Sequence, residues 1–168
     1  MHRRLVPVDF ALLSPGVLRR ALPIALLRAR EATLRPFRAH LDGHGVTVQQ
    51  WRVIRALAEG AAMTPTDLAE RCVLMPPSLS RILKTLTARG LVEQVGDAAD
   101  GRRKRVAIAA GGRALYDRVA GRSDEIYAEL EAAFGADRMD RLLDLLVDLH
   151  RVADRMHATE GAGPEAEG

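Results

Sequence analysis

Aromatic residues are scarce in this chain of 168 residues. Phenylalanine, tyrosine and tryptophan make up 4% of it, whereas the hydrophobic residues as a whole reach 48%. Any core must therefore be built from Leu, Val, Ile and Ala. Because helix formers are many and β-branched runs are few, this composition favours a mostly helical protein. The length suits one domain with a proper core.

Several other features are missing. Cys72 is the only cysteine, which excludes an intrachain disulfide and a cysteine-based metal cluster. No apolar run reaches membrane-spanning length, and Pro7 and Asp9 interrupt the segment after the basic start. We find no Ser-His-Asp set, no paired catalytic carboxylates, no phosphate loop and no metal-ligand spacing. These absences predict a cytoplasmic protein that is not an enzyme and has no membrane segment, metal or cofactor.

The first predicted helix covers residues 22–41. Leu27, Leu34 and Leu41 recur every seven positions, and Arg30 and Phe37 occupy the same face between them. Pro36 should kink this helix because it removes a backbone donor.

Capping signals then predict three shorter helices. Thr47 and Gln50 form a capping-box pattern, and Thr64 is followed by a proline at the first helical position. Gly90 is placed to stop the third helix. The expected ranges are residues 47–59, 64–71 and 77–89.

Two short extended segments follow, at residues 91–95 and 105–109. The segment Asp100-Gly101-Arg102-Arg103-Lys104-Arg105 joins them, so we expect a β-hairpin with a basic tip. Long helices are expected over residues 112–134 and 137–157. The fold class is mainly α with a small β-hairpin wing, a winged helix-turn-helix. The predicted parts are an irregular arm (1–19), a dimerisation helix (20–45), a DNA-binding lobe (46–110), dimerisation helices (111–158) and a disordered tail (159–168).

A helix with a polar face beside a basic hairpin fits the two grooves of a DNA duplex. Seven Lys and Arg against three Asp and Glu lie within residues 76–105, a positive excess that suggests phosphate contacts. Small polar residues allow close approach to base edges, and an arginine on a thin loop suits the minor groove. Asp100 repels phosphate, so we expect it to hold Arg102 by an ion pair. The candidate DNA-binding residues are Pro77, Ser78, Ser80, Arg81, Lys84, Asp100, Arg102, Arg103 and Lys104. The alternative interpretation is a solvated surface helix and hairpin.

This pattern resembles the MarR family of winged-helix regulators. The matching residues are Thr64-Pro65-Thr66-Asp67-Leu68-Ala69, Pro77-Ser78-Leu79-Ser80-Arg81-Ile82-Leu83, Arg89-Gly90-Leu91-Val92 and Asp100-Gly101-Arg102. The resemblance implies that the second helix of the motif enters the major groove and Arg102 the minor groove. It further implies a homodimer on a pseudo-palindromic operator. One departure is Ile108-Ala109, where the family usually has Leu-Thr, and the change removes a helix cap.

Residues 25–32 and 47–52 look more narrowly like the homoprotocatechuate-operon repressors of that family. The resemblance implies a repressor that is released by a small aromatic (phenolic) acid. Arg30 is the main candidate for the acid's carboxylate, because a guanidinium on an apolar stripe must be paired or face a cavity. A structural pairing at the dimer contact, with Glu31, an aspartate or a backbone carbonyl, remains the other interpretation. The lesser candidates for the same pocket are Arg28, His40, His44 and Trp51, the last of which also fits as a helix staple.

Two other functions stay open at this point. Cys72 is placed at the turn between the two helices of the motif, so its oxidation in a redox-responsive repressor could disturb DNA binding. A single cysteine also serves as small core filler. A protein-binding module that uses its winged helix to hold a partner is the second alternative, and it would not need a basic tip.

Overall fold

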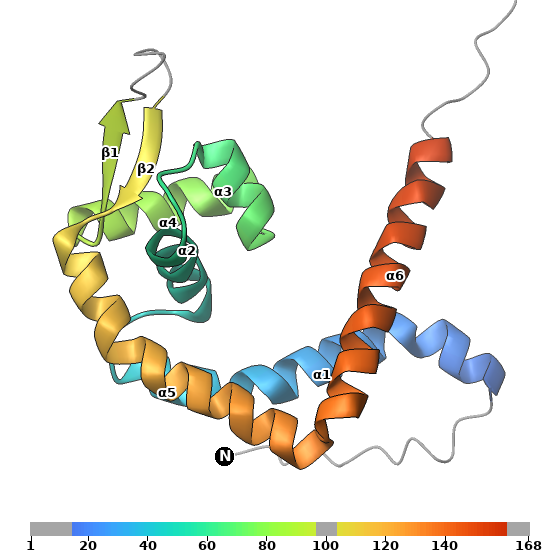
Figure 1. The fold of residues 1–168 in the computed structure, drawn as a ribbon. Coiled ribbons are helices and arrows are strands. Elements are labelled where there is room, and N and C mark those ends of the chain that lie inside the picture. Colours follow the sequence, from blue (N-terminus) through green and yellow to red (C-terminus); the bar gives the residue numbers. More distant parts are fainter. Residues whose placement is uncertain (1–14, 97–103, 161–168) are drawn as a thin grey trace, which may run out of the picture. The chain divides into compact units, whose positions relative to one another are not determined.

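The computed structural model describes residues 15–96 and 104–160, and the side chains of residues 21–96 and 104–156. In these ranges the chain forms helices and one antiparallel hairpin (Figure 1), which confirms the predicted mainly α fold class. Two compact units, Met1–Ala120 and Gly121–Gly168, divide the chain. The elements are α1 (Pro15–Asp42), α2 (Val48–Glu59), α3 (Pro65–Cys72), α4 (Pro76–Ala88), β1 (Val92–Gly96), β2 (Lys104–Ile108), α5 (Ala110–Phe134) and α6 (Ala136–Glu160).

The core of the first unit is aliphatic, as the low aromatic content predicts. Burying each large aliphatic side chain contributes roughly 1.5–3 kcal/mol, so the apolar faces of α2, α3 and α4 hold these helices together. Cys72 is part of the same cluster and serves as a small core residue. The largest fully buried aliphatic side chains are Leu41, Ile54, Leu57, Leu68, Leu79 and Leu86.

The predicted helix caps are confirmed. The backbone N–H of Gln50 donates to Thr47 Oγ1 over 3.2 Å, and the Thr47 N–H donates to Gln50 Oε1 over 3.0 Å. At α3, the N–H of Asp67 donates to Thr64 Oγ1 over 3.2 Å. Each cap satisfies helix N–H groups that have no partner within the helix, and each contributes about 1 kcal/mol.

The hairpin lies one residue away from its predicted position at each strand. Val92 pairs with Ile108 at the open end, and Gly96 pairs with Lys104 at the end where the connecting loop begins. Val106 also exchanges two backbone hydrogen bonds with Met63, of 2.7 and 3.0 Å, so the hairpin is fastened to the segment before α3. The tip of the hairpin, with Asp100, Arg102 and Arg103, lies outside the described residues.

Helix α1 begins at Pro15, so the predicted arm of residues 1–19 was wrong for residues 15–19. Proline is tolerated in the first helical turn, where its missing N–H would have no helical partner, and this explains the early start. The predicted break after Asp42 is confirmed, and Gly45 lies there at φ 66°.

Helix α5 begins two residues earlier than predicted, at Ala110. A Cβ on Gly112 would collide with the backbone oxygen of Leu91, and one on Gly111 would lie 2.7 Å from the oxygen of Gly90. The two glycines therefore allow the start of α5 to pass close to the end of the motif. The helix forms here without the threonine cap that the family usually has.

The second unit contains the end of α5 and α6. Helix α6 continues to Glu160, so the boundary of the predicted tail at residue 159 was wrong, while residues 161–168 lie outside the described part. No helix in the described part of the chain is long and apolar enough to cross a membrane. Several large apolar side chains of α6 are 40 to 67% exposed, namely Leu142, Leu143, Leu145, Val147, Val152 and Met156.

Val73 ends α3 in the left-handed conformation, with φ 49° and ψ 56°. This conformation brings Cβ too close to the carbonyl oxygen and costs a non-glycine residue about 1–2 kcal/mol. The side chain contributes little packing in return, because it is 83% exposed.

Val73→Gly should therefore raise the free energy of unfolding by about 0.5–1 kcal/mol. This value is the strain that glycine relieves, reduced by the conformational entropy that glycine adds to the unfolded chain. Urea unfolding at one fixed protein concentration measures this. Val73→Ala, which keeps a Cβ, serves as the control and should give a smaller change. A loss of stability in Val73→Gly would show that the turn carries no such strain.

Candidate functional site

Helix α4 presents two different faces. Leu79, Ile82 and Leu86 are buried against the core, and Leu83 is half-buried. The side chains on the other face are exposed: Pro77, Ser78, Ser80, Arg81 and Lys84. The structure thus brings the predicted α4 residues together on one accessible surface.

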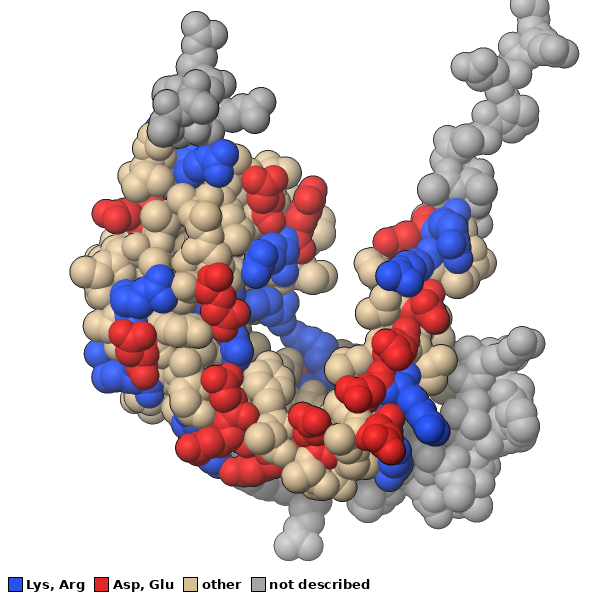
Figure 2. Space-filling view, in the orientation of Figure 1, with Lys and Arg blue, Asp and Glu red and all other residues tan. Residues whose placement is uncertain are grey.

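Part of the predicted basic excess is used inside the fold. Arg89 Nη1 donates to the carbonyl of Gly45 over 2.8 Å, and Arg105 Nη1 donates to the carbonyl of Ala62 over 3.1 Å. Lys104, at the start of β2, is exposed. The local charge count therefore overstates the positive charge that is available to a partner. On the face shown in Figure 2, which lies away from α4, acidic and basic side chains of the lobe alternate.

A shallow cavity of about 300 Å³, open to solvent and lined mostly by exposed residues, lies where α1 meets the start of α2. Its volume is at the lower end of the range for small-molecule sites. Two guanidinium groups, two aliphatic side chains and several polar groups meet there. The lining residues are Arg30, Leu34, Arg38, Asp42, Thr47, Val48 and Gln49.

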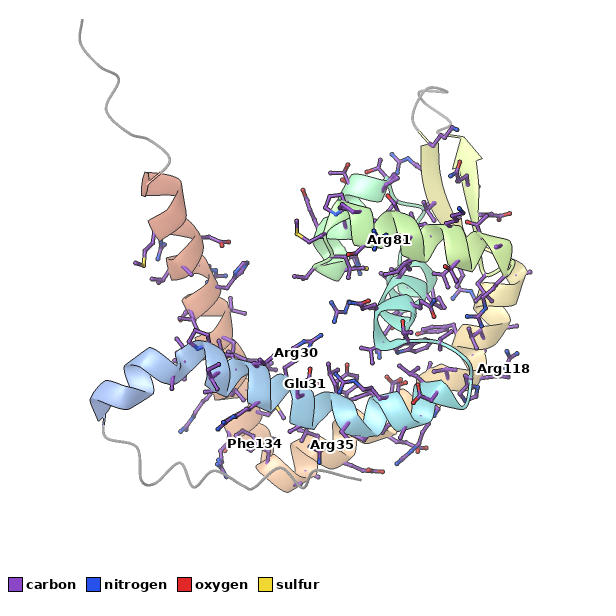
Figure 3. The ribbon with its side chains drawn as sticks, turned by 180° about the vertical axis from the view of Figure 1, so that it is seen from behind. Arg30, Glu31, Arg35, Arg81, Arg118 and Phe134 are labelled. Atoms are coloured by element: carbon purple, nitrogen blue, oxygen red, sulfur yellow. The ribbon has the colours of Figure 1, made fainter. Side chains whose placement is uncertain are left out.

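Both cavity arginines share one carboxylate, that of Glu31 (Figure 3 labels Arg30 and Glu31 on α1). Arg30 Nη1 lies 2.8 Å from Glu31 Oε1, and Arg38 Nη2 lies 2.7 Å from Oε2. The hydrogen bond from Arg38, followed by the charges of both arginines, lowers the pKa of Glu31. Of the structural partners considered for Arg30, the structure shows Glu31. The Arg30 side chain is nevertheless 50% exposed, so it is not buried in an apolar stripe.

The lesser ligand candidates lie elsewhere among the described residues. Arg28 is exposed on α1 and does not line the cavity. The Nε2–H of His40 donates to the carbonyl of Val119 over 3.1 Å, and its ring contacts His44 edge to face. These histidines therefore support the packing of α1.

Sequence reasoning missed Arg38 and Asp42 as cavity residues. Together with Arg30 and Leu34 they recur every four positions along α1, a spacing that places side chains on one helix face. This spacing is present in the sequence, and the set shares Arg30 and Leu34 with the apolar heptad of the same helix.

Trp51 belongs to a separate cluster between α2 and α5. It is buried, and its ring stacks on Tyr116 at a centroid distance of 5.7 Å. The Tyr116 hydroxyl donates to Glu59 Oε1 over 3.1 Å, and Arg55 Nε donates to the same oxygen over 2.7 Å. Glu59 thus joins Arg55 to the tyrosine of a stacked aromatic pair, an arrangement that sequence reasoning did not identify.

Comparisons with known proteins agree with this architecture. The profile described as MarR family matches residues 44–103. The homoprotocatechuate degradative operon repressor of Escherichia coli is 40% identical over 126 residues, which cover 75% of this chain and 85% of that protein. The chain belongs to the MarR family. It is therefore a DNA-binding transcription regulator rather than an enzyme, and the predicted winged helix-turn-helix is confirmed.

Two further relatives cover most of this MarR-family chain. The transcriptional regulator FarR of Neisseria gonorrhoeae is 36% identical over 138 residues, 82% of this chain and 94% of FarR. The crystal structure of NadR in complex with 4-hydroxyphenylacetate has 35% identity and a TM-score of 0.68, and the match covers 86% of this chain and 97% of NadR.

The environment of Cys72 in this MarR-family protein suppresses thiol reactivity. The residue is fully buried, and its Sγ–H donates to the carbonyl of Arg52 over 3.7 Å. Burial raises the pKa of the thiol, and the nearby charges of Arg52 and Arg71 offset this only in part. Because the thiolate is the reactive species, the geometry weighs against the redox alternative.

Native protein should accordingly react with a thiol reagent such as DTNB at least about tenfold more slowly at pH 7 than protein in urea. The assay is unambiguous because Cys72 is the only cysteine. Rapid stoichiometric labelling of the native protein would contradict the burial argument and favour a redox role.

Lys84→Ala tests the exposed face of α4. If Lys84 contacts a DNA phosphate, its removal should reduce the slope of log affinity against log salt by about one unit. Fluorescence anisotropy with a labelled duplex over a range of salt concentrations measures that slope. Arg118→Ala, which removes an exposed charge on α5, is the matched control and should leave the slope unchanged. Equal slopes for Lys84→Ala and wild type would remove Lys84 from the interface.

Proposed function

We propose that this chain is a homodimeric repressor of a pseudo-palindromic operator, released from DNA by a small aromatic (phenolic) acid. The observation that carries the proposal is the cavity with Arg30 and Arg38, in a chain similar to a crystallised regulator that binds 4-hydroxyphenylacetate. The Escherichia coli relative is named as an operon repressor, which supports repression rather than activation.

In this proposal α4 is the recognition helix and enters the major groove. Ser78 and Ser80 approach base edges, while Arg81 and Lys84 reach phosphates or guanine. The wing places Arg102 in the minor groove, with Arg103 and Lys104 near the backbone. Two copies related by a two-fold axis would read half-sites about one helical turn apart. A regulator of genomic DNA would work in the cytoplasm.

Exposed apolar side chains support the homodimer. On α1, Leu22, Ile24 and Leu27 are exposed, and α6 carries the apolar side chains described above. Apolar surface of this extent is typical of helices that pack against a partner. We propose that the partner is a second copy of the chain, which buries both helices.

The cavity has the chemistry that an aromatic acid needs. The guanidinium groups of Arg30 and Arg38 can bind a carboxylate, in competition with Glu31. Leu34 and Val48 provide an apolar surface for a ring. Hydrogen bonds to a phenolic hydroxyl are available from Asp42, Thr47 and Gln49.

Release of DNA requires only that the acid binds one arrangement of the dimer better than the other. A difference of a few kcal/mol between the arrangement that fits the operator and one that does not is sufficient. The acid need not touch the DNA-binding face.

Two alternatives remain distinguishable. A redox-responsive repressor would act through Cys72, and a protein-binding winged helix would hold a protein partner instead of a duplex. Peroxide treatment of a Cys72→Ser variant tests the redox-responsive repressor. Titration with duplex DNA tests the protein-binding module, which would not bind the duplex.

Arg30→Gln should weaken binding of 4-hydroxyphenylacetate by about tenfold or more and abolish ligand-induced release, with operator affinity within about twofold of wild type. The reason is the loss of one charged partner for the carboxylate. Calorimetry gives the ligand affinity, and anisotropy with an operator selected from random duplexes gives the release.

Arg28→Gln is the matched control, since Arg28 lies on the same helix but outside the cavity, and it should behave as wild type. Arg55→Gln tests the Trp51–Tyr116 cluster as the alternative carboxylate site. Normal ligand binding by Arg30→Gln together with a loss in Arg55→Gln would move the effector site to that cluster.

A further inference from the structure

Two arginines hold the chain on either side of the recognition helix. Arg52 of α2 bonds to the end of α3, just before α4, and Arg89 bonds from the end of α4 to the loop before α2. We infer that Arg52 and Arg89 are positioning residues for DNA reading, which hold α4 at the angle that sequence-specific contacts require. The inference goes beyond the proposed function and rests on its assignment of α4 as the reading helix.

Arg52 acts at the start of α4. Its Nη1 donates to the carbonyl of Cys72 over 2.7 Å, and the Cys72 thiol donates back to the carbonyl of Arg52. The carbonyls one turn earlier, of Ala69 and Glu70, already accept from backbone N–H groups. Arg52 thus satisfies the last carbonyl of α3 from a neighbouring helix. Only residues 73–75 separate this anchored point from α4.

Arg89 acts at the end of α4. Gly90 follows it at φ 66°, and the N–H of Leu91 donates to the carbonyl of Leu86 over 2.9 Å. These two features cap the end of the helix and fix the backbone of Arg89. Its side chain reaches the carbonyl of Gly45 over 2.8 Å. Gly45 lies in the loop that leads into α2, seven residues before Arg52. The segment before α4 and the end of α4 are therefore both hydrogen-bonded to residues 45–52.

Directional bonds matter here because the buried contacts beneath α4 are not directional. Aliphatic packing resists separation of the helices but tolerates small changes of angle better than hydrogen bonds do. A helix of 13 residues is about 20 Å long, so a tilt of about 10° around its middle moves each end by roughly 2 Å. Hydrogen bonds to base edges have a tolerance of about half an ångström. Phosphate attraction, which acts over about 10 Å, would persist.

The inference therefore separates specificity from general affinity. Arg52→Gln and Arg89→Gln should each lower affinity for the selected operator by about tenfold, as expected for base contacts made at a wrong angle, with affinity for random duplex within about twofold. The salt slope should stay unchanged, since neither side chain neutralises a phosphate. Lysine at either position should restore part of the operator affinity, because its ammonium can donate to the same carbonyl.

Arg113→Gln is the matched control. Arg113 Nη1 donates to the carbonyl of Ala58 over 2.8 Å, so the variant loses the same kind of bond, but between α5 and α2 rather than at α4. Its ratio of operator to random-duplex affinity should equal that of wild type. All affinities are measured well below the thermal transition of each variant. Arg89 is exposed, so its variants remain informative even if Arg52→Gln does not fold.

Three results would overturn the inference. An unchanged affinity ratio in Arg89→Gln and in folded Arg52→Gln removes the positioning role. A salt slope that falls by about one unit assigns these arginines to direct phosphate contact. If Arg113→Gln lowers the ratio of operator to random-duplex affinity by the same factor, the effect is due to general destabilisation. Ser80→Ala with Lys84→Ala tests the proposed function separately, since unchanged operator binding in both would show that α4 is not the reading helix.

Discussion

The orientation of the DNA-binding motif depends on the buried contact that α4 makes with the core. Leu79, Ile82 and Leu86 occupy one side of the helix, and their burial forces Ser78, Ser80, Arg81 and Lys84 to the other side. Figure 3 shows Arg81 on this helix. The polar face is thus a consequence of the apolar one. Because three buried aliphatic side chains are worth several kcal/mol, the exposed residues can be small or charged without loss of stability.

Arginine side chains join the elements of the first unit to one another. Four arginines of the first unit donate to backbone carbonyls that are 20 to 55 residues away in the sequence. Each bond joins two elements and satisfies a carbonyl in a loop or near a helix end, where helical partners are missing. A sequence pI near 9.6 therefore does not translate directly into a DNA-binding surface. Only the arginines and lysines that are exposed and lack such a function contribute to it.

Local chemistry made much of this fold predictable. Thr47 with Gln50, and Thr64 with its following proline, are signals that act within four residues, and both caps formed as expected. Contacts between distant residues left no such signal. Nothing near Arg89 in the sequence indicates Gly45 as its partner, and nothing in the sequence indicated that Arg38 shares the carboxylate of Glu31 with Arg30. The sequence does not reveal the early start of α1, because proline is common both in irregular segments and in the first turn of a helix.

The effector cavity and the recognition helix share one loop. Asp42 and Thr47 line the cavity, and Gly45, which lies between them, accepts the hydrogen bond from Arg89 at the end of α4. In the proposed function, an acid that displaces Glu31 and draws α1 and α2 into a new arrangement would move the carbonyl to which α4 is attached. A shift of about 1 Å there would break or re-aim a directional bond while the aliphatic packing under α4 stayed intact. The acid could thus change operator reading without unfolding the lobe and without approaching the DNA.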